Sequence, residues 1–405
     1  MRYLYKIVIF LIGLVLIILI GSSVLISPTY IYRILRHGES DYYDFMIFTE
    51  RHIAASPMPF YYLTSPDGIL SDLIVDFNKG GENLQKPLDE FLSGSDTTAF
   101  IIVRDDTLVY EGYYNGFERN SINTSFSAVK SIVSLLIGIA IDQGYVTSEK
   151  DSIAEYIHEF KDRDFETLTI EDLLLMRSPI KYREGLAWFG DDAKTYYMPD
   201  LRRLALEEIR IDPNYKGSFH YNNYHPLLLG IIIERSTGKA VADFLEEQLW
   251  TKIGTEYPAS WSLDSEENGF EKMESGLNYR AIDMAKIGSM LLNKGRWENE
   301  IIISTDWLAR SIHASFPLDE YDYRGTFLED SGIGYQFMWY SQANQRGGFD
   351  YFAAGKFGQF LYVSPDNNVV IVRNGITEGR VDDWPRVMAT LAHKVGEMNG
   401  DETGQ

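Results

Sequence analysis

The chain of 405 residues contains no cysteine and no Gly-x-Ser-x-Gly motif, and its seven histidines form no His-x-x-x-His pair. The lack of cysteine excludes disulfide bonds, although it does not decide the compartment. Without cysteine or paired histidines we expect no structural or catalytic zinc. We also predict no other metal and no cofactor. Because the Gly-x-Ser-x-Gly turn is missing, an α/β-hydrolase would need its nucleophile elsewhere.

Basic residues are few relative to acidic ones, with 37 Lys and Arg against 59 Asp and Glu and a formal net charge of −22. Such a surface repels phosphate backbones, so we expect no nucleic-acid partner. The hydrophobic share of 45% and the aromatic share of 14% are typical of a packed globule. The length suffices for a large core divided between two subdomains around one cleft.

Charged residues are absent from residues 7–32, and residues 7–20 are almost entirely Ile, Leu, Val and Phe. Because this run lies near the start of the chain, behind two basic residues, it favours a signal-anchor over a buried helix. We therefore predict a single-pass transmembrane helix within residues 1–26. Gly21 and Ser23 also fit a cleavage site, and cleavage there would release a soluble, exported protein.

The pattern Ser127-x-x-Lys130 stands at the head of an apolar run over residues 132–140. Residues i and i+3 share a helix face, so the Lys130 amine can reach the Ser127 hydroxyl and take its proton. Unpaired N–H groups at the helix start favour a developing oxyanion. Residues 178–181 and 236–239 also match Ser-x-x-Lys, but neither opens a long apolar helix. The alternative is that Ser127 caps a core helix and Lys130 is solvated.

Two further short patterns follow in a fixed order. Tyr221-Asn222-Asn223 precedes an apolar helix predicted over residues 227–233, and Lys356-Phe357-Gly358-Gln359 leads into a strand-like run. Each pattern also occurs elsewhere, as in Tyr113-Tyr114-Asn115 and Lys286-Ile287-Gly288. Taken alone, neither therefore indicates chemistry.

The three patterns in this order resemble the signature of the serine β-lactamase and penicillin-binding-protein superfamily, which is Ser-x-x-Lys, then Tyr-x-Asn, then Lys-x-Gly or His-x-Gly. Within it, the chain is most similar to class C β-lactamase-related esterases, amidases and 6-aminohexanoate-oligomer hydrolases, over roughly residues 85–395. The resemblance implies an α+β fold of the β-lactamase/transpeptidase type. Along the chain, predicted strands come first, helices follow and strands return. This order also favours an antiparallel sheet flanked by helices, with a helical subdomain inserted.

The resemblance also implies roles for individual residues. Ser127 would be the acylated nucleophile and Lys130 its base, while Tyr221 would protonate the leaving group and help to activate water. Asn223 would hold Lys130 and a substrate carbonyl by hydrogen bonds. Lys356 would add positive potential along the strand edge and attract a carboxylate.

The third pattern supplies the other groups that the resemblance implies. At one position it also departs from the signature of the superfamily. The backbone N–H groups of Ser127 and Gln359 would form the oxyanion hole, and Gly358 would let the substrate approach the strand. Phe357 stands where Ser or Thr is usual, which argues against efficient turnover of β-lactams or D-Ala-D-Ala peptides. Because no Glu-x-x-Leu-Asn segment precedes Tyr221, deacylation through Tyr221 is favoured.

Aromatic residues precede the Tyr221 pattern, in a region that borders the pocket in the resembled family. They could shape the choice of substrate, and ordinary packing is the alternative. His220, beside Tyr221, is more simply explained as a packed neighbour than as a catalytic group. The aromatic residues are Tyr182, Trp188, Phe189, Tyr196 and Tyr197.

We divide the chain into a signal-anchor (1–26), a partly extended connector (27–75), a hydrolase domain (76–397) and a polar tail (398–405). Within the domain we expect a β-hairpin, three later strands and a final helix. These elements are predicted at residues 99–103 with 107–111, then 335–340, 359–363, 369–373 and 384–397.

The sequence thus predicts a membrane-anchored serine hydrolase that cleaves a small ester or amide through an acyl-enzyme on Ser127. A D,D-peptidase or β-lactamase acting on cell-wall peptides or β-lactams is one alternative, and an inactive binding module of the same fold is another. Basic residues flank both ends of the anchor, so charge does not fix its orientation. We place the catalytic domain outside a bacterial inner membrane because the resembled family acts there.

Overall fold

The computed structural model describes Tyr3, Tyr5, Lys6 and residues 27–65, 70–161, 165–185, 187–312 and 332–398. Most of the predicted signal-anchor and nearly all of the predicted polar tail lie outside these residues. Within the described ranges, no helix combines the length and the apolar character needed to cross a bilayer.

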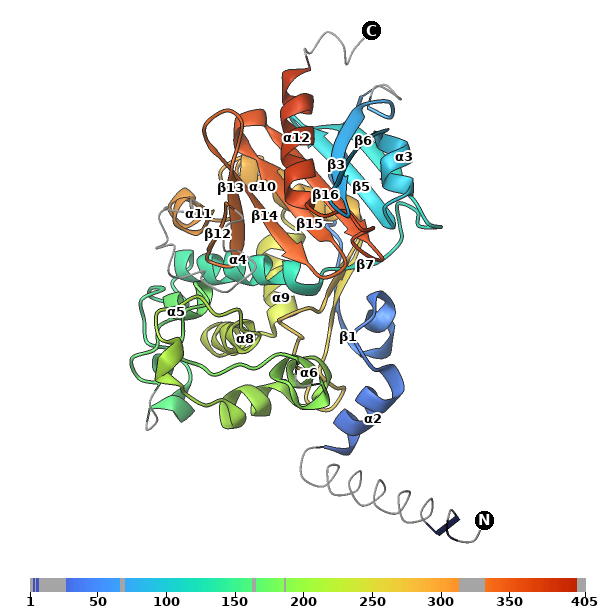
Figure 1. The fold of residues 1–405 in the computed structure, drawn as a ribbon. Helices are drawn as coiled ribbons and strands as arrows, with labels where there is room; N and C mark the ends of the chain where they lie inside the picture. Colours follow the sequence, from blue (N-terminus) through green and yellow to red (C-terminus); the bar gives the residue numbers. More distant parts are fainter. Residues whose placement is uncertain are drawn as a thin grey trace.

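An eight-stranded sheet forms the upper half of the molecule (Figure 1). All neighbouring strands are antiparallel except β2 and β6, which pair in parallel at one edge. In spatial order the strands are β12 (Ile333–Gln336), β13 (Trp339–Ala343), β14 (Phe349–Gly355), β15 (Gln359–Ser364), β16 (Val369–Gly375), β5 (Thr97–Arg104), β6 (Thr107–Tyr113) and β2 (Leu63–Thr64). The predicted hairpin and the strands near 359–363 and 369–373 are confirmed.

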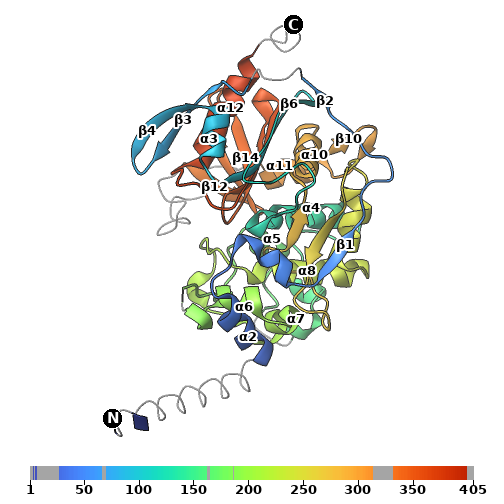
Figure 2. The same ribbon diagram turned by 90° about the vertical axis from the view of Figure 1, so that its right-hand side faces the viewer.

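Helices α10 (Ala281–Leu292) and α12 (Trp384–Glu397) cover opposite faces of this sheet (Figures 1 and 2). Helix α10 packs directly on the strands, because a Cβ at Gly288 would lie 2.4 Å from Val370. With both faces covered, β5 and β16 are buried along almost their whole length. This double burial explains why both strands appear in the sequence as continuous apolar runs.

Helix α4 (Val129–Asp142) separates the sheet from a helical lower half (Figure 1). Residues 129–140 are all buried, as expected for a helix that is apolar on every side. The lower half contains α5 (Ile170–Leu174), α6 (Asp191–Tyr197), α7 (Leu201–Arg203), α8 (Tyr224–Thr237) and α9 (Val241–Leu245). The predicted insertion of helices between two groups of strands is therefore confirmed.

A second, four-stranded antiparallel sheet links the two halves. Its strands are β1 (Glu50–Ile53), β8 (Ala259–Ser262), β9 (Leu277–Tyr279) and β7 (Asn123–Thr124). The structure also contains the hairpins β3 (Ile74–Lys79) with β4 (Glu82–Pro87) and β10 (Arg296–Trp297) with β11 (Glu300–Ile301), and the helices α3 (Leu88–Ser93) and α11 (Thr305–Ile312). Strand β7 leads directly into the turn that carries Ser127.

Residues 27–75, expected to be partly extended, begin with helix α2 (Pro28–His37) and also contain a 3-10 helix and strand β1. Ser27 accepts a hydrogen bond from the Tyr30 backbone N–H, and proline occupies the first turn, so α2 carries an ordinary start signal. Tyr30 and Ile34 are buried against the rest of the molecule. The segment is therefore packed onto the helical half, and its domain boundary stays a prediction.

The single strand expected at residues 335–340 is wrong, because the chain reverses there. Strands β12 and β13 pair with each other, and Phe337 and Met338 form the turn between them with φ angles of 42° and 64°. Neither residue is a usual turn former, so the aromatic run conceals the reversal.

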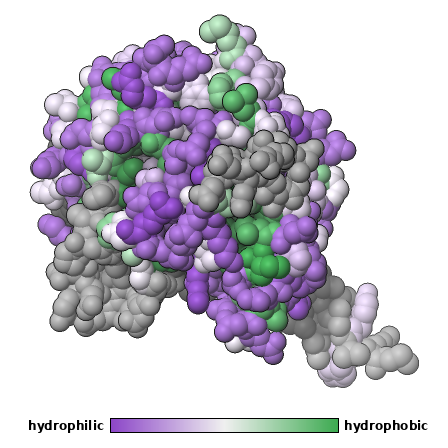
Figure 3. Space-filling model, turned by 90° about the horizontal axis from the view of Figure 1, so that it is seen from above, coloured by the Kyte–Doolittle hydropathy of each residue, from purple (hydrophilic) through white to green (hydrophobic). Residues whose placement is uncertain are grey.

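Seen from above, the sheet end of the molecule presents a mainly hydrophilic surface (Figure 3).

Candidate active site

Ser127 lies in a short 3-10 helix, η2 (Phe126–Ala128), which leads directly into α4. The Ser125 backbone N–H donates to Leu277 of β9, so the pairing of β7 with β9 fixes the start of this turn. One helical turn later, Lys130 Nζ lies 2.8 Å from Ser127 Oγ. The structure thus brings together the hydroxyl and the amine that the sequence pattern suggested.

Lys130 is almost completely enclosed, with 1% of its surface exposed. Its Nζ also donates to the Glu274 backbone carbonyl at 3.1 Å, and it lies 4.8 Å from the centre of the Tyr221 ring. The oxygen atoms bound to this amine are uncharged, because one belongs to a hydroxyl and one to a carbonyl. Lys130 therefore contacts the Ser127 hydroxyl and the Tyr221 ring, and it forms no ion pair among the described residues.

The turn between β14 and β15 lies beside the nucleophile. A Cβ at Gly355 would lie 3.1 Å from the Ser127 backbone nitrogen, which shows how closely β14 approaches η2. Lys356 is exposed, and its Nζ donates to Ser40 Oγ at 2.6 Å. The Phe357 ring packs against Phe126, with the ring centres 5.1 Å apart. Phe357 is thus held in aromatic packing and offers no hydroxyl at this turn.

Gly358 and Gln359 have structural contacts that the sequence did not suggest. Gly358 has a φ of 77°, and a Cβ there would lie 2.0 Å from Arg373 Nη1, so a buried guanidinium requires this glycine. From the sequence, Gly358 was expected to let the substrate approach the strand, but that role is not needed to explain why a glycine stands here. The buried Gln359 side chain donates to the Gly375 carbonyl at 2.7 Å and accepts from Asn374 at 2.8 Å, which fixes the start of β15.

Asn223 does not hold Lys130 in this structure. Its Nδ2 donates to the Tyr182 hydroxyl at 2.8 Å and to Thr195 Oγ1 at 3.3 Å. Its Oδ1 is buried and has no hydrogen-bond partner. The amide nitrogen is drawn away from Lys130 because α6 and the Tyr182 loop supply these two hydroxyls. Asn223 nevertheless lines the same pocket as Ser127.

A pocket of about 690 Å³ opens beside Ser127. Its walls come from η2, the β14–β15 turn, the loop before β9, helix α6 and the segment that follows α2. The lining residues are Ile34, Gly38, Glu39, Ser40, Phe126, Ser127, Glu184, Gly185, Trp188, Asp192, Ala193, Tyr196, Tyr197, Asn223, Glu274, Ser275 and Lys356. Of the five aromatic residues singled out in the sequence, Trp188, Tyr196 and Tyr197 line this pocket.

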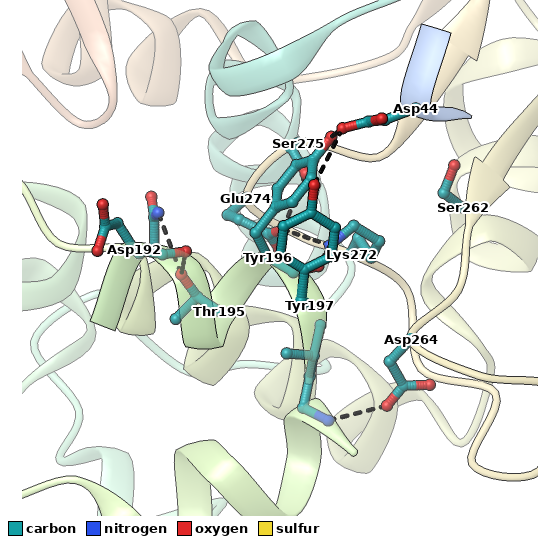
Figure 4. A network of polar contacts seen from close by, with 12 residues as sticks. Asp44, Asp192, Thr195, Tyr196, Tyr197, Ser262, Asp264, Lys272, Glu274 and Ser275 are labelled. Carbon is teal, nitrogen blue, oxygen red and sulfur yellow. Dashed lines mark hydrogen bonds and ion pairs between the residues drawn. The ribbon is translucent and has the colours of Figure 1, made fainter. Parts of the chain in front are cut away.

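A buried polar network supports the pocket wall (Figure 4). Lys272 Nζ lies 3.0 Å from Glu274 Oε1 and 4.4 Å from the centre of the Tyr196 ring. The Tyr196 and Tyr197 hydroxyls both point to Asp44, at 3.1 and 3.4 Å. Burial lowers the pKa of Lys272 and raises that of Asp44. The network therefore joins the segment after α2 to helix α6 and to the loop before β9.

Several of these residues carried no sequence signal. Glu274 and Ser275 reach the site only because β9 pairs with β7, and Ser40 arrives because α2 packs on the helical half. Glu184 and Asp192 also line the pocket, and nothing in their local sequence distinguishes them from the many other acidic residues of this chain. Burial raises the pKa of Glu184, and the nearby charge of Asp192 raises it further.

The other candidate groups lie in ordinary packing environments. His220 lies 3.0 Å from the Tyr182 carbonyl and stacks on Tyr215, and burial lowers its pKa. Ser178, which begins another Ser-x-x-Lys match, is fully buried against His225. Across the part of the chain that the structure describes, no three His, Asp or Glu side chains are grouped as a metal ion would require.

Comparison with known proteins gives one family match that covers most of the chain. The Beta-lactamase family profile matches residues 88–390. The 6-aminohexanoate-dimer hydrolase of Paenarthrobacter ureafaciens is 25% identical over 318 residues, which are 74% of this chain and 75% of that protein. The teichoic acid D-alanine hydrolase of Staphylococcus aureus (strain MRSA252) is 28% identical over 211 residues, about half of each chain.

Solved structures share the fold. A putative 6-aminohexanoate-dimer hydrolase from Bacillus anthracis superposes with a TM-score of 0.73 at 24% identity and covers 86% of this chain and 90% of its own. A class C beta lactamase from Rhodobacter sphaeroides superposes with a TM-score of 0.53 at 13% identity and covers 75% and 96%. At these identities the likeness concerns the fold alone.

Proposed function

Because the chain belongs to the Beta-lactamase family and is a serine hydrolase, we propose that it cleaves a small ester or amide through an acyl-enzyme on Ser127. The observation that carries this proposal is the 2.8 Å distance between Lys130 Nζ and Ser127 Oγ at the wall of a pocket. A serine becomes an effective nucleophile when a neighbouring base takes its proton.

In the proposed reaction, Ser127 Oγ attacks the substrate carbonyl carbon and its proton passes to the neutral amine of Lys130. The bond to the leaving group then breaks, and the departing alcohol or amine takes up a proton through Tyr221. Water attacks the acyl-enzyme and gives a proton to the Lys130–Tyr221 pair. That proton passes to Ser127 Oγ as its bond to the acyl carbon breaks and the carboxylic acid product leaves. Lys130 Nζ lies 4.8 Å from the centre of the Tyr221 ring, which places the two residues side by side.

Two features favour this substrate class over β-lactams and D-Ala-D-Ala peptides, which carry a carboxylate. Phe357 packs on Phe126 and offers no hydroxyl to such a group. The pocket lining also contains four carboxylates, from Glu39, Glu184, Asp192 and Glu274, and these would repel it. Lys356 alone among the lining residues carries a positive charge.

A fluorophosphonate probe tests the nucleophile. We expect mass spectrometry of the full chain to find one adduct, on Ser127. A folded protein that stays unlabelled would contradict the proposal. Parallel assays with a short-chain p-nitrophenyl ester and a chromogenic cephalosporin separate the substrate classes, since rapid cephalosporin turnover would instead support a β-lactamase.

We further propose that residues 1–26 anchor the enzyme in a bacterial inner membrane, with the catalytic domain outside. The uncharged run over residues 7–32 supports this, as does α2, which begins within the end of that run and exposes 63% of Tyr32 and 54% of Leu35. Alkaline carbonate extraction of membranes tests the anchor, and protease treatment of spheroplasts tests the orientation. Release of the protein from membranes by carbonate would contradict the anchor. Protection of the catalytic domain from protease in intact spheroplasts would contradict its location outside the membrane.

A further inference from the structure

Two aromatic side chains project into solvent beside the pocket of Ser127. Trp188 exposes 50% of its surface and Phe189 exposes 61%, whereas every other Trp and Phe that the structure describes is buried or partly buried. The two residues follow each other in a short 3-10 helix, η5 (Ala187–Phe189). Aromatic side chains are strongly stabilised by leaving water, so a pair held in solvent indicates a contact surface.

Helix α2 adds two more exposed apolar side chains. The Tyr30 hydroxyl donates to the Trp188 carbonyl at 2.6 Å, which holds α2 against η5. Tyr30 and Ile34 are buried against the protein, while Tyr32 and Leu35 lie on the opposite side of the helix with 63% and 54% of their surfaces exposed. Helix α2 therefore has apolar side chains on both sides, although only one side packs on the protein.

The place of α2 in the chain indicates what covers its outer side. Residues 7–26 carry no charge, and only Ser27 separates them from α2, which begins at Pro28. One residue spans at most about 3.6 Å. With residues 1–26 as the proposed anchor, α2 starts at the membrane surface, at the lower end of the molecule in Figures 1 and 2. The lipid bilayer is therefore the surface that α2 meets first.

Charged groups set the depth that this side of the molecule can reach. Helix α2 contains Arg33 and Arg36, Arg36 is exposed, and no acidic residue precedes Glu39 in the chain. Arginine beside exposed aromatic residues is typical of the lipid headgroup layer. Glu39 and Glu184 are also exposed, and both carboxylates would lose their hydration in hydrocarbon. The charges thus favour contact with headgroups over deeper insertion.

The pocket of Ser127 shares residues with this region. Trp188 is exposed and also lines the pocket, and so do Ile34 of α2 and the stretch from Gly38 to Ser40 that follows it. The segments that would contact lipid are therefore the same segments that border the entrance for substrate. A molecule held in the headgroup layer would meet the pocket directly.

We propose that Tyr32, Leu35, Trp188 and Phe189 form a lipid-docking face, which rests on the headgroup layer beside the anchor and presents the pocket to the bilayer. The substrate is then an amphiphile whose ester or amide bond lies near the membrane surface. This inference rests on the hydrolase function and the anchor proposed above, and it adds the source and the class of the substrate.

Tryptophan fluorescence tests the docking. All seven tryptophans lie in described ranges, and the six other than Trp188 are buried. The full chain is reconstituted in liposomes of phosphatidylcholine and phosphatidylglycerol, with or without bromine near the headgroup end of the acyl chains. We expect the brominated lipid to quench the tryptophan emission, and Trp188→Phe to abolish most of that quenching while it keeps an aromatic ring in the face.

A double variant tests the contribution of α2. Tyr32→Ser with Leu35→Ser should reduce the quenching. It should also lower about 5-fold the rate for p-nitrophenyl palmitate dissolved in the bilayer, relative to the rate for p-nitrophenyl acetate in water. The matched control is Met58→Ser with Leu63→Ser, since these side chains are 82% and 76% exposed. Met58 lies beside the β10–β11 hairpin and Leu63 lies in β2 at the sheet edge, so this control should change neither reading.

The possible failures are distinguishable. Protein that floats with the liposomes but shows equal quenching with and without Trp188 would overturn the docking face. A rate ratio that the Tyr32 and Leu35 changes leave unaltered would overturn its role in substrate supply. Protein that does not float would overturn the anchor, and hydrolysis that persists in Ser127→Ala would overturn the hydrolase function.

Discussion

Ser127 and Ser178 each lie within hydrogen-bonding distance of a nitrogen base, but their surroundings differ. Ser127 Oγ is 2.8 Å from Lys130 Nζ and lines a pocket, whereas Ser178 Oγ is 2.6 Å from His225 Nε2 and is completely buried. Both serines also begin a Ser-x-x-Lys pattern. A base beside a hydroxyl is therefore not sufficient, because a substrate must also reach the oxygen.

The lysines of the protein show the same contrast. Lys286, in one of the repeated Lys-x-Gly patterns, is completely buried but lies 3.1 Å from Asp283 and 3.4 Å from Glu256. Lys130 is just as buried, yet its bound oxygens belong to a hydroxyl and a carbonyl. A lysine paired with two buried carboxylates compensates their charges, while one with neutral partners is available for proton transfer.

The largest expected effect separates the two serines. Ser127→Ala should lower kcat/KM for a p-nitrophenyl ester by about 10³-fold or more, because it removes the atom that is acylated. Ser178→Ala should keep activity within a few-fold when rates are corrected for the folded fraction measured by circular dichroism. Loss of activity in a well-folded Ser178→Ala protein would remove the contrast between the two sites.

The two lysines should respond differently to removal of their amines. Lys130→Met should lower kcat/KM by about 10²- to 10⁴-fold with little loss of stability, because no carboxylate is left without its partner. Lys286→Met should cost about 3–5 kcal/mol of unfolding free energy, because Asp283 stays buried without this counter-charge, while Glu256 keeps its ion pair with Arg119. Initial rates and urea unfolding measure the two effects. An inactive but stable Lys286→Met protein would contradict this division.

The turn beside Ser127 can be tested through its glycine. Gly358→Ala should destabilise the protein by about 2–4 kcal/mol, because the added Cβ meets Arg373 at a left-handed backbone position. Urea unfolding gives the loss, and Gly347→Ala provides a control, because it has a φ of 86° but open space around its Cβ. Equal losses at both positions would show that backbone strain alone accounts for the effect.

A smaller effect concerns the pH dependence of stability at the Ser178 site. Burial lowers the pKa of His225 to about 3 from 6.5, so between these values the unfolded chain binds a proton that the folded chain does not. Stability is therefore complete above pH 6.5 and falls as the pH drops. Between pH 7.5 and 5 this group should cost about 2 kcal/mol, which His225→Gln should remove. Identical pH dependence in both proteins would contradict the assignment.

Local patterns predicted much of the fold and part of the site. The hairpin β5–β6, helices α4, α8 and α12, and the Ser127–Lys130 pair each depend on residues close together in the chain, so the sequence could indicate them. The reversal at Phe337 and Met338 lacks turn residues and could not be seen. The contributions of Glu274 and Ser40 depend on the packing of distant segments, which short-range periodicity does not contain.

The contact between Ser40 and Lys356 has a practical consequence for work on shortened forms of this enzyme. The apolar run ends before α2, so a truncation after residue 26 would keep Ile34 and the stretch from Gly38 to Ser40 in place. A truncation at the start of β1 would delete one wall of the cavity and free the Lys356 amine. Recombinant versions intended for inhibitor screening should therefore begin no later than Ser27.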